Sequence, residues 1–572
     1  MIEAGVRFAR PESDPHRSSP DSFHGNVATP RRDNGVRPIA EVKLLPNRSV
    51  VPSPTRLALI LIASITGLVA IWPVLTLVRE ALTSLHSGFS DLGPDGMRQI
   101  VGTIQLLLGT ATLGTLLGTA NGWLLCNCRF PGRAWLRIAQ LIPLATPAYL
   151  LSAILVDLGS RHSWTIHGMG WGIAVMALTT YPYVFLLSTE SFSVSGQRQL
   201  EACRSLGVGP WSAFRRVALP IALPAIGAGV ALMGMEVVNE LGAVQLLGIP
   251  SLSAGILETW QSNGDPAGAI SLALITLVIV LTLVVCERSL RRRSRRWSDG
   301  VAGGDATAWH LHGFRAGVAQ LLAVIPPIVS LGTPLLWAAS NLDQLQTSWN
   351  DDLISLSGRS LLLALVAAVL AVTAALVLAI AKRWSSAPWL KSLTFLAGTG
   401  YAIPGTVLAL ALLLTGAPWQ VAPLLLLLWG YSDRFLAVAK GGLDAALERI
   451  SPSLDEAATG MGSPWQRVLQ RVHLPLLRGP ITVGLLLVFV DTVKELPLTF
   501  ALRPFDFDTL SVRVFQYAGD ERLAEAMLPA LMILVLGLIA AMALVPTLDH
   551  ASRREGSLSL IHISEPTRPV PI

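Results

Sequence analysis

Charged residues are scarce in this chain of 572 residues. Asp, Glu, Lys and Arg together make up 14% of the sequence, whereas hydrophobic residues make up 52%. A soluble globular domain has about 25% charged residues, and a disordered chain is polar and charged. The composition therefore excludes both a soluble enzyme of ordinary domains and a disordered protein. A membrane-spanning helix needs about 20 apolar residues, so the length leaves room for about twelve such helices with loops.

Cysteine is also rare, and the usual catalytic motifs are missing. The four cysteines, at positions 126, 128, 203 and 286, show neither a disulfide framework nor the spacing of a zinc site. We interpret them as small apolar residues and predict no metal site. No Gly-x-x-x-x-Gly-Lys-Ser/Thr loop for nucleotide phosphates occurs, nor does a Gly-x-Ser-x-Gly or His-Glu-x-x-His motif. We therefore expect no catalytic residue and no cofactor bound by this chain.

Long apolar blocks occur instead, in two sets of six. Together they predict an all-α polytopic membrane protein of about twelve helices in two halves. The first set lies near 57–78, 100–125, 135–157, 170–190, 221–247 and 266–286. The second lies near 316–339, 359–381, 392–415, 419–439, 476–500 and 523–547. Pro147 and Pro404 occupy similar places in the third and ninth blocks and predict kinks there.

Arginine and lysine in the loops indicate the orientation. The N-terminal segment and the loops after the second, fourth and sixth blocks are rich in Arg, whereas 249–265 has no basic residue. Cytoplasmic loops carry the excess of positive charge, so we expect both termini in the cytoplasm. The loop at 501–522 departs from the rule, but its three arginines are balanced by acidic residues. The net charge of +6 then reflects membrane orientation, and we expect no nucleic-acid partner.

The parts outside the apolar blocks divide the chain into segments. The composition of residues 1–52, which are rich in Arg, Pro, Ser and Asp, predicts a disordered cytoplasmic tail without a signal peptide. Residues 53–290 and 316–550 form the two predicted halves, joined by a cytoplasmic linker at 291–315. Residues 557–572 include the string LSLIHISEPTRP, which resembles a translated sequencing adaptor. We expect this tail to be non-native.

The strongest pattern is an internal repeat between the fourth and fifth blocks of each half. Glu201 and Ala202 are followed by Gly207 and then by Leu219-Pro220. The same residue types occur again 255 residues later, as Glu456, Ala457, Gly462, Leu474 and Pro475. A Glu-Ala start favours a helix, Gly permits a turn, and Pro suits the first turn of the next helix. The pattern predicts a helix-turn-helix elbow, whose second arm is a short helix that ends at Leu-Pro.

These two stretches resemble the EAA motif of ABC importer permeases. The match is complete in the second half, whereas Cys203 replaces the second Ala in the first half. The resemblance implies that both elbows are coupling helices that dock on ATPase subunits, with contacts by Glu201, Ala202, Gly207 and their equivalents. ATP with its Mg²⁺ would then bind to two separate ATPase subunits, and a periplasmic protein would deliver the substrate.

Further stretches are similar to the fused, double-length permeases of ferric-iron importers. They begin at Thr180 (TYPYVF), Met235 (MEVVNELG), Tyr401 (YAIPGTV), Lys494 (KELPLT) and Arg503 (RPFDFDTL). This resemblance implies a permease in the bacterial inner membrane, surrounded by lipid, with ferric iron as its substrate. Fused permeases for thiamine, and related ones for polyamines or phosphonates, share much of the pattern. A secondary transporter also uses repeats, but it has no ATPase to dock on such elbows.

Two acidic pairs belong to the same repeat. Glu236 and Glu240 lie four residues apart in the fifth block, and Asp491 and Glu495 follow them by 255 residues. Residues four apart share one face of a helix. A rise of about 1.5 Å per residue from Pro220 puts Glu236 about 24 Å and Glu240 about 30 Å along it, at the outer end of the membrane. Such groups either line a cation pathway, or they hold the gate helices by hydrogen bonds and pair with Lys494.

Overall fold

The computed structural model describes residues 54–86, 92–194, 197–295, 308–344, 348–349, 351–385 and 387–561. The predicted N-terminal tail, residues 296–307 of the predicted linker, and residues 562–572 of the suspected adaptor tail lie outside these residues. The helices of the described part pack as one unit that begins at Ser53. Helix α24 extends to Ile561 and so includes the first residues of the suspected tail.

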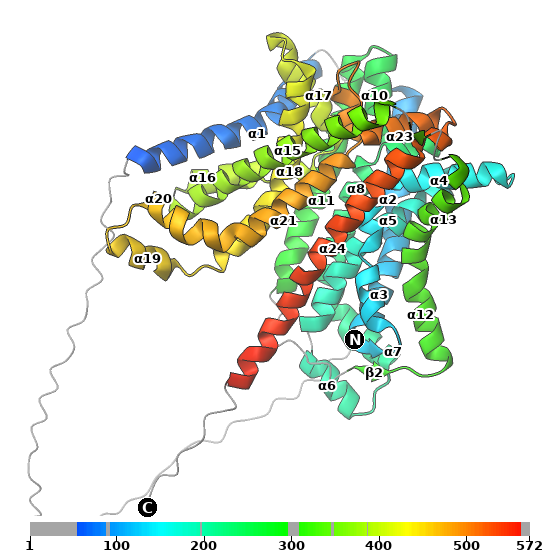
Figure 1. Cartoon of the computed structure of the whole chain (residues 1–572), viewed down its shortest axis with the longest axis vertical. Helices are drawn as coiled ribbons and strands as arrows, with labels where there is room; N and C mark the ends of the chain where they lie inside the picture. The colour runs from blue at the N-terminus through cyan, green and yellow to red at the C-terminus, as the bar shows by residue number, and fades with distance from the viewer. Residues whose placement is uncertain are drawn as a thin grey trace, which may run out of the picture. The chain divides into compact units, whose positions relative to one another are not determined.

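The described chain is almost entirely helical (Figure 1). Its first half contains α1 (Pro54–His86), α2 (Gly93–Asn127), β1 (Cys128–Arg129), α3 (Arg133–Ala139), η1 (Ile142–Ala145), α4 (Ala148–Arg161), α5 (Met169–Val194), α6 (Gln197–Ser205), α7 (Pro210–Ala213), η2 (Phe214–Ala218), α8 (Leu219–Asn239), α9 (Gly242–Leu246), α10 (Leu252–Leu257), η3 (Glu258–Ser262) and α11 (Pro266–Arg295).

The second half follows in chain order. It contains β2 (Trp309–His310), α12 (Phe314–Pro327), η5 (Ile328–Gly332), α13 (Thr333–Ser340), η6 (Leu342–Gln344), α15 (Asp351–Trp384), α16 (Pro388–Ala397), η7 (Gly400–Ala402), α17 (Gly405–Gly416), η8 (Ala417–Trp419), α18 (Pro423–Glu448), α19 (Pro452–Gly460), α20 (Trp465–Val468), η9 (Leu469–His473), α21 (Leu474–Val493), α22 (Pro497–Leu502), α23 (Leu510–Gly519) and α24 (Leu523–Ile561).

The number of spans is close to the predicted number of about twelve. Among the described residues, nine helices are long and apolar enough to cross a membrane, and two bent pairs would bring the number to eleven. The remaining predicted span is α18, a helix of 26 residues. It contains Asp433, Arg434 and Lys440, all buried inside the protein. Charged side chains inside a membrane bundle face its interior, so α18 is sheltered by its neighbours.

The third and ninth predicted spans are broken rather than continuous. Segment 133–145 meets 148–161 at 88°, and 388–402 meets 405–419 at 120°. Pro147 and Pro404 stand at the two breaks with extended backbone, directly before α4 and α17. Proline has no N–H to continue the preceding helix. The predicted kinks are therefore full breaks.

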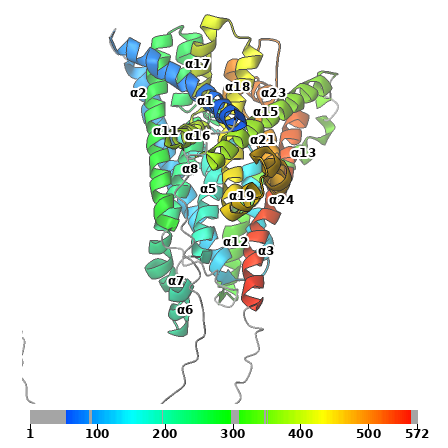
Figure 2. The same ribbon diagram turned by 90° about the vertical axis from the view of Figure 1, so that its left-hand side faces the viewer.

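The two halves exchange their first helices. Helix α1 packs on α15, α16 and α17 of the second half, whereas α12 packs on α2 and α3 of the first. Figure 2 shows α1 across the second-half helices α15 and α16. Cross-half hydrogen bonds join Trp337 Nε1 to Asp157 Oδ2 at 2.8 Å and Gln140 Nε2 to the Ala323 carbonyl at 2.7 Å. The halves of the sequence are therefore interlocked in space.

The four cysteines are free thiols. Cys128 lies in an apolar cluster with Leu200 and Ala218, and its burial raises the pKa of the thiol to about 12. A thiol that stays protonated at physiological pH is a poor metal ligand and nucleophile. Cys128 therefore acts as a packing residue.

Glycine allows the central helices of the first half to approach closely. A Cβ atom at Gly118 of α2 would lie 2.7 Å from Val184 Cβ and 2.9 Å from the Phe185 backbone nitrogen on α5. A Cβ atom at Gly229 of α8 would lie 2.8 Å from Val184 Cα. Small residues at helix contacts are a main source of association inside membranes. Helix α5 is thus held between α2 and α8 by two glycines.

We expect Gly118→Ala to lower the thermal midpoint of the protein in lipid nanodiscs, because backbone atoms of α5 cannot move away as a flexible side chain can. Gly358→Ala on α15 is the matched control. A Cβ atom added at Gly358 would meet no neighbouring residue within 4 Å, and Ala favours a helix over Gly by about 1 kcal/mol. Equal midpoints for the two variants would contradict this view of the α2–α5 contact.

Candidate functional site

Two helix-turn-helix elbows stand at equivalent places in the halves. Helix α6 and helix α19 carry the Glu-Ala pairs, and each is followed by a glycine in the left-handed region, Gly207 at φ 70° and Gly462 at φ 78°. Glycine adopts this conformation without strain. The turn then leads into α7 and α20. Figure 1 shows α6 beside α7 and α19 beside α20.

The tips of both elbows are exposed. Glu201, Ala202 and Gly207 lie on the surface, as do their equivalents Glu456, Ala457 and Gly462. The residue before each glycine is a large hydrophobic one: Leu206 and Met461 are each 80% exposed. An apolar side chain at the same point of both tips suits a protein contact.

The second arm of each elbow differs from the prediction of a separate short helix. Residues 210–239 form one helix of 30 residues, and residues 465–493 form one of 29. Pro220 and Pro475 lie inside these helices, each just after a π-helical turn. The Leu219 N–H donates to the Phe214 carbonyl and the Leu474 N–H to the Leu469 carbonyl. This wider turn accommodates the missing N–H of proline, so each elbow joins its membrane helix without a break.

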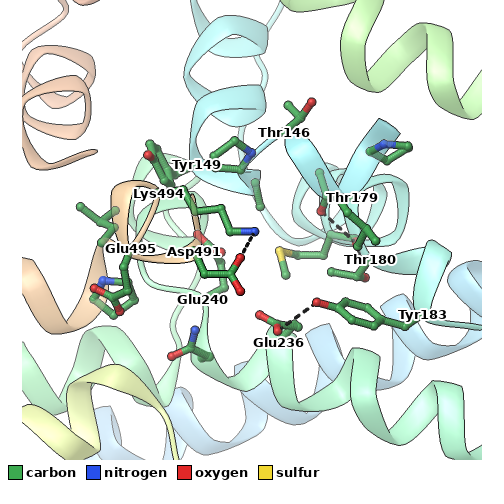
Figure 3. Close-up of a pocket in the computed structure, with 18 of the residues that line it drawn as sticks. Thr146, Tyr149, Thr179, Thr180, Tyr183, Glu236, Glu240, Asp491, Lys494 and Glu495 are labelled. Carbon is green, nitrogen blue, oxygen red and sulfur yellow. Dashed lines mark hydrogen bonds and ion pairs between the residues drawn. The ribbon is translucent and has the colours of Figure 1, made fainter. Parts of the chain in front are cut away.

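All four carboxylates of the repeated acidic pairs line one cavity between the halves (Figure 3). The cavity has a volume of about 790 Å³, its open mouth included. Two further cations, Arg434 and Lys494, line it. Taken as ionised, these six side chains carry a formal charge of −2, since four carboxylates face two cations.

The acidic pairs do not share one helix face, contrary to the prediction. Helix α8 ends at Asn239 and helix α21 ends at Val493, so Glu240 and Glu495 lie beyond the helices. Their side chains turn to the short helices that follow. Glu240 Oε1 accepts from the Ala243 N–H at 2.9 Å.

Glu495 makes the corresponding contacts in more detail. Its two carboxylate oxygens accept from the Leu498 and Thr499 N–H groups, each at 3.1 Å. The Thr499 hydroxyl also donates to Oε2 at 2.9 Å. Carboxylates satisfy the free N–H groups at a helix N-terminus. Glu240 and Glu495 are therefore bonded as the anchoring interpretation expects.

The first member of each pair is placed differently. Glu236 Oε1 accepts hydrogen bonds from the hydroxyls of Tyr183 at 3.1 Å and Tyr401 at 2.5 Å, one from each half. Asp491 Oδ1 pairs with Lys494 Nζ at 2.8 Å. Figure 3 shows Tyr183 pointing to Glu236 and Lys494 pointing to Asp491. Both carboxylates are half-buried, and a role in the passage of a cation stays a prediction.

Asn239 lines the cavity and links the two halves. Its Oδ1 accepts from the Gly405 N–H of α17 at 2.8 Å and from Arg434 Nη1 at 3.0 Å. Arg434 also donates to the Ile403 carbonyl at 3.3 Å. The break before α17 thus receives a hydrogen-bond partner from the other half.

The cavity keeps polar groups without a partner. The hydroxyls of Tyr149 and Thr146 line it and make no hydrogen bond, although the two residues are only 3% and 2% exposed. Among the described residues, no group of three or more His, Cys, Asp or Glu side chains could hold a metal ion. The cavity offers carboxylate and hydroxyl oxygens from both halves without forming a closed chelating site.

The sequence reasoning missed several of these residues. Tyr183 and Tyr401 lie within the segments 180–185 and 401–407 that carried the family resemblance, but no role was predicted for them. Arg434 could have been found, because a charge inside an apolar block is a functional signal. The role of Asn239 had no sequence signal, since its partners come from distant helices.

Comparison with known proteins adds independent information. Residues 111–296 match the family described as "Binding-protein-dependent transport system inner membrane component". The chain is 25% identical over 461 residues to the Fe(3+)-transport system permease protein FbpB 2 of Haemophilus influenzae, covering 77% of this chain and 88% of that protein.

Shorter permeases match about a quarter to a third of the chain. The molybdenum transport system permease protein ModB of Escherichia coli K12 is 26% identical over 214 residues, 34% of this chain and 93% of that protein. The sulfate transport system permease protein CysT of the same strain is 31% identical over 161 residues, 26% of this chain and 58% of that protein.

We expect Glu495→Ala to destabilise the protein by about 1–3 kcal/mol, because it leaves two buried N–H groups unsatisfied. Glu240→Ala, which removes one such hydrogen bond, should have a smaller effect. Glu190→Ala, at an exposed position of α5, is the control. The measurement is denaturant unfolding in nanodiscs. Equal stability of the Glu495 and Glu190 variants would show that Glu495 does not anchor α22.

Proposed function

We propose that this permease component of a binding-protein-dependent ABC transport system forms the whole membrane-spanning part of an importer and translocates ferric iron. Two ATPase subunits would dock on the two elbows, and a binding protein would deliver the substrate at the opposite end of the helices. Both termini would be cytoplasmic, on the side of the elbows. ATP would bind and be hydrolysed on the partner subunits.

The observation that carries the proposal is the continuity between elbow and cavity. The helix of residues 210–239 begins at the first elbow and holds Glu236 in its last turn. The helix of residues 465–493 does the same with Asp491 in the second half. At about 1.5 Å per residue, 26 residues correspond to about 39 Å. A movement imposed on an elbow would therefore be passed along one continuous helix to the cavity.

The charge of the cavity supports a cationic substrate. Four carboxylates face two cations, and hydroxyls of Tyr149, Tyr183 and Tyr401 add neutral oxygen atoms. A doubly negative oxyanion would meet a net negative field there, whereas a hard cation would find oxygen ligands. Binding that is weak and divided among several groups suits transit, because the substrate must also leave.

Ferric iron is supported by the similarity to FbpB 2, which extends over both halves. Thiamine and polyamines, which are also cations, remain alternatives that the cavity charge does not separate from iron. A phosphonate fits the negative cavity less well. A secondary transporter is the weaker alternative of another class, since the exposed Leu206 and Met461 tips would have no partner there.

The docking proposal predicts the effect of a charge at each tip. We expect Leu206→Asp and Met461→Asp each to reduce the copurified ATPase from two copies to one, and the double variant to lose both, because an aspartate would have to be desolvated in the contact. Phe505→Asp is the control. Phe505 is fully exposed but lies between α22 and α23, away from the elbows.

The subunit ratio is measured by native mass spectrometry of the complex purified with its partner ATPase. Retention of two ATPase copies by the double variant would refute docking at the tips. Loss of the ATPase in the Phe505 variant would mean that the effect is not specific.

The pathway proposal predicts the effect of neutralising the cavity. We expect Glu236→Gln and Asp491→Asn each to reduce uptake of radioactive ferric iron about tenfold, equivalent to about 1.4 kcal/mol, while ATPase binding is kept. Glu258→Gln, exposed near the same end of the helices, should transport normally. Uptake of molybdate and sulfate is measured in parallel. Unchanged iron uptake would remove the pathway role, and uptake of an oxyanion instead of iron would refute the substrate.

A further inference from the structure

The two elbows are held to the helix bundle by different chemistry at equivalent positions. Three positions related by the repeat carry Cys128, Leu200 and Ala218 in the first half and Arg383, Asp455 and His473 in the second. Cys128 directly follows the long helix α2, and Arg383 lies in the last turn of the long helix α15; the other residues of each set come from the first helix of the elbow and from the last position of the π-helical turn. The three positions are therefore structurally equivalent in the two halves.

The second elbow is held by a buried ionic network centred on Asp455 of α19. Oδ2 of Asp455 pairs with Arg383 Nε at 2.7 Å, and Oδ1 is 2.7 Å from His473 Nε2. The side chain of His473 is fully buried, and those of Arg383 and Asp455 are 14% and 16% exposed. One carboxylate thus joins α19 to α15 and to the start of α21.

Arg383 extends the network to α18. Its Nη1 donates to the Leu447 carbonyl at 2.6 Å and its Nη2 to the Ile450 carbonyl at 3.0 Å. These carbonyls lie at the end of α18, where unpaired acceptors favour a cation. A neighbouring cluster, in which Lys382 and Lys440 both pair with Asp444, adds further charge between α15 and α18.

The first elbow carries apolar side chains at these three positions. Cys128, Leu200 and Ala218 are 1%, 2% and 4% exposed and belong to one hydrophobic cluster. Aromatic rings complete it: Trp123 lies 5.6 Å from Phe192 and 5.2 Å from Phe214, measured between ring centroids. Apolar contact has no preferred direction, so these three side chains do not fix the direction of the contact as a hydrogen-bonded charge does.

Hydrogen-bonded charges behave differently from such a cluster. The Asp455 carboxylate satisfies two donors at once, and displacement of α19 would leave buried charges unpaired. A charge-assisted network is also strongly directional. The second elbow is therefore connected to α21 by a linkage that transmits force and resists sliding.

We propose that Asp455 is a positioning residue of the second elbow: through Arg383 and His473 it locks α19 to α15, α18 and α21, so that the two halves respond unequally to their ATPase subunits. The lock itself is a property of this chain, whereas its use in transport rests on the proposed function. In this arrangement, a movement of the second elbow displaces Asp491 at the far end of α21. The first elbow is less tightly coupled to its half.

The lock is tested by spin-label distances in the full chain in nanodiscs. After replacement of the four native cysteines, one label pair is placed at Leu454 and Arg478 and the matched pair, 255 residues earlier, at Gln199 and Leu223; all four positions are exposed. We expect Asp455→Asn to broaden the 454–478 distance distribution and to leave 199–223 unchanged. An amide offers one acceptor where the carboxylate offers two.

Several variants control this measurement. Asp455→Glu should partly restore the narrow distribution, because it keeps the charge. Glu448→Gln removes an exposed charge at the end of α18 and should change nothing. Arg383→Met combined with Asp455→Asn should be no worse than the more severe single variant, as expected for residues that act as a unit. An unchanged 454–478 distribution in Asp455→Asn, or equal broadening of both pairs, would overturn the proposal.

The use of the lock is measured separately in proteoliposomes with the ATPase and the binding protein. We expect Asp455→Asn to keep ATP hydrolysis but to lower the substrate transported per ATP about tenfold, the usual size of an allosteric coupling. A broadened 454–478 distance with unchanged transport per ATP would limit Asp455 to a structural tie and overturn its positioning role. If the unmodified chain neither binds the ATPase nor transports substrate, the proposed function is refuted. The 454–478 distance distribution would still test whether Asp455 locks the second elbow.

Discussion

Every backbone N–H and C=O inside a membrane needs a partner from the protein itself, and the central breaks of this fold depend on that constraint. Helices stop at Asn239 and Val493 and resume at Gly242 and Pro497. The interruptions are tolerable because Glu240 and Glu495 accept hydrogen bonds from the next helices. Non-helical backbone at such depth is found where it is buried in protein or lines a cavity. The helix breaks and the polar cavity therefore occur together, because residues that line the cavity satisfy the backbone groups freed at the breaks.

Hydrogen bonds at these breaks and in the cavity also join the two halves. Asn239 of the first half satisfies the Gly405 N–H at the start of α17 in the second. Glu236 of the first half accepts from Tyr401 of the second. Together with the exchanged helices α1 and α12, these bonds make the cavity a shared structure. Any relative movement of the halves changes its lining, which is the property that alternating access requires.

Pseudo-symmetry holds for the backbone and fails for the side chains. The elbow helices, the π-helical turns and the left-handed glycines recur at an interval of 255 residues. In contrast, Glu236 binds two tyrosines where Asp491 binds a lysine. Arg383, Asp455 and His473 stand where the first half has Cys128, Leu200 and Ala218. A single chain that contains both halves allows this, because each half can change without altering the other.

The sequence by itself determined the class of fold, the repeat and the elbows. These conclusions rest on local features: apolar blocks of spanning length, a Glu-Ala start and a glycine at a fixed distance. Local features depend only on residues that are close in the sequence, so they can be recognised without the tertiary structure. The sequence predicted about twelve spans, with kinks at Pro147 and Pro404 where the structure has full breaks. Its prediction of a shared helix face for each acidic pair was wrong, because the helices end at Asn239 and Val493. The breaks depend on partners such as Asn239, which lies 166 residues from Gly405. Only the tertiary structure decided the exchange of first helices, the cavity between the halves and the network at Asp455, because these consist of contacts between segments that no local pattern relates.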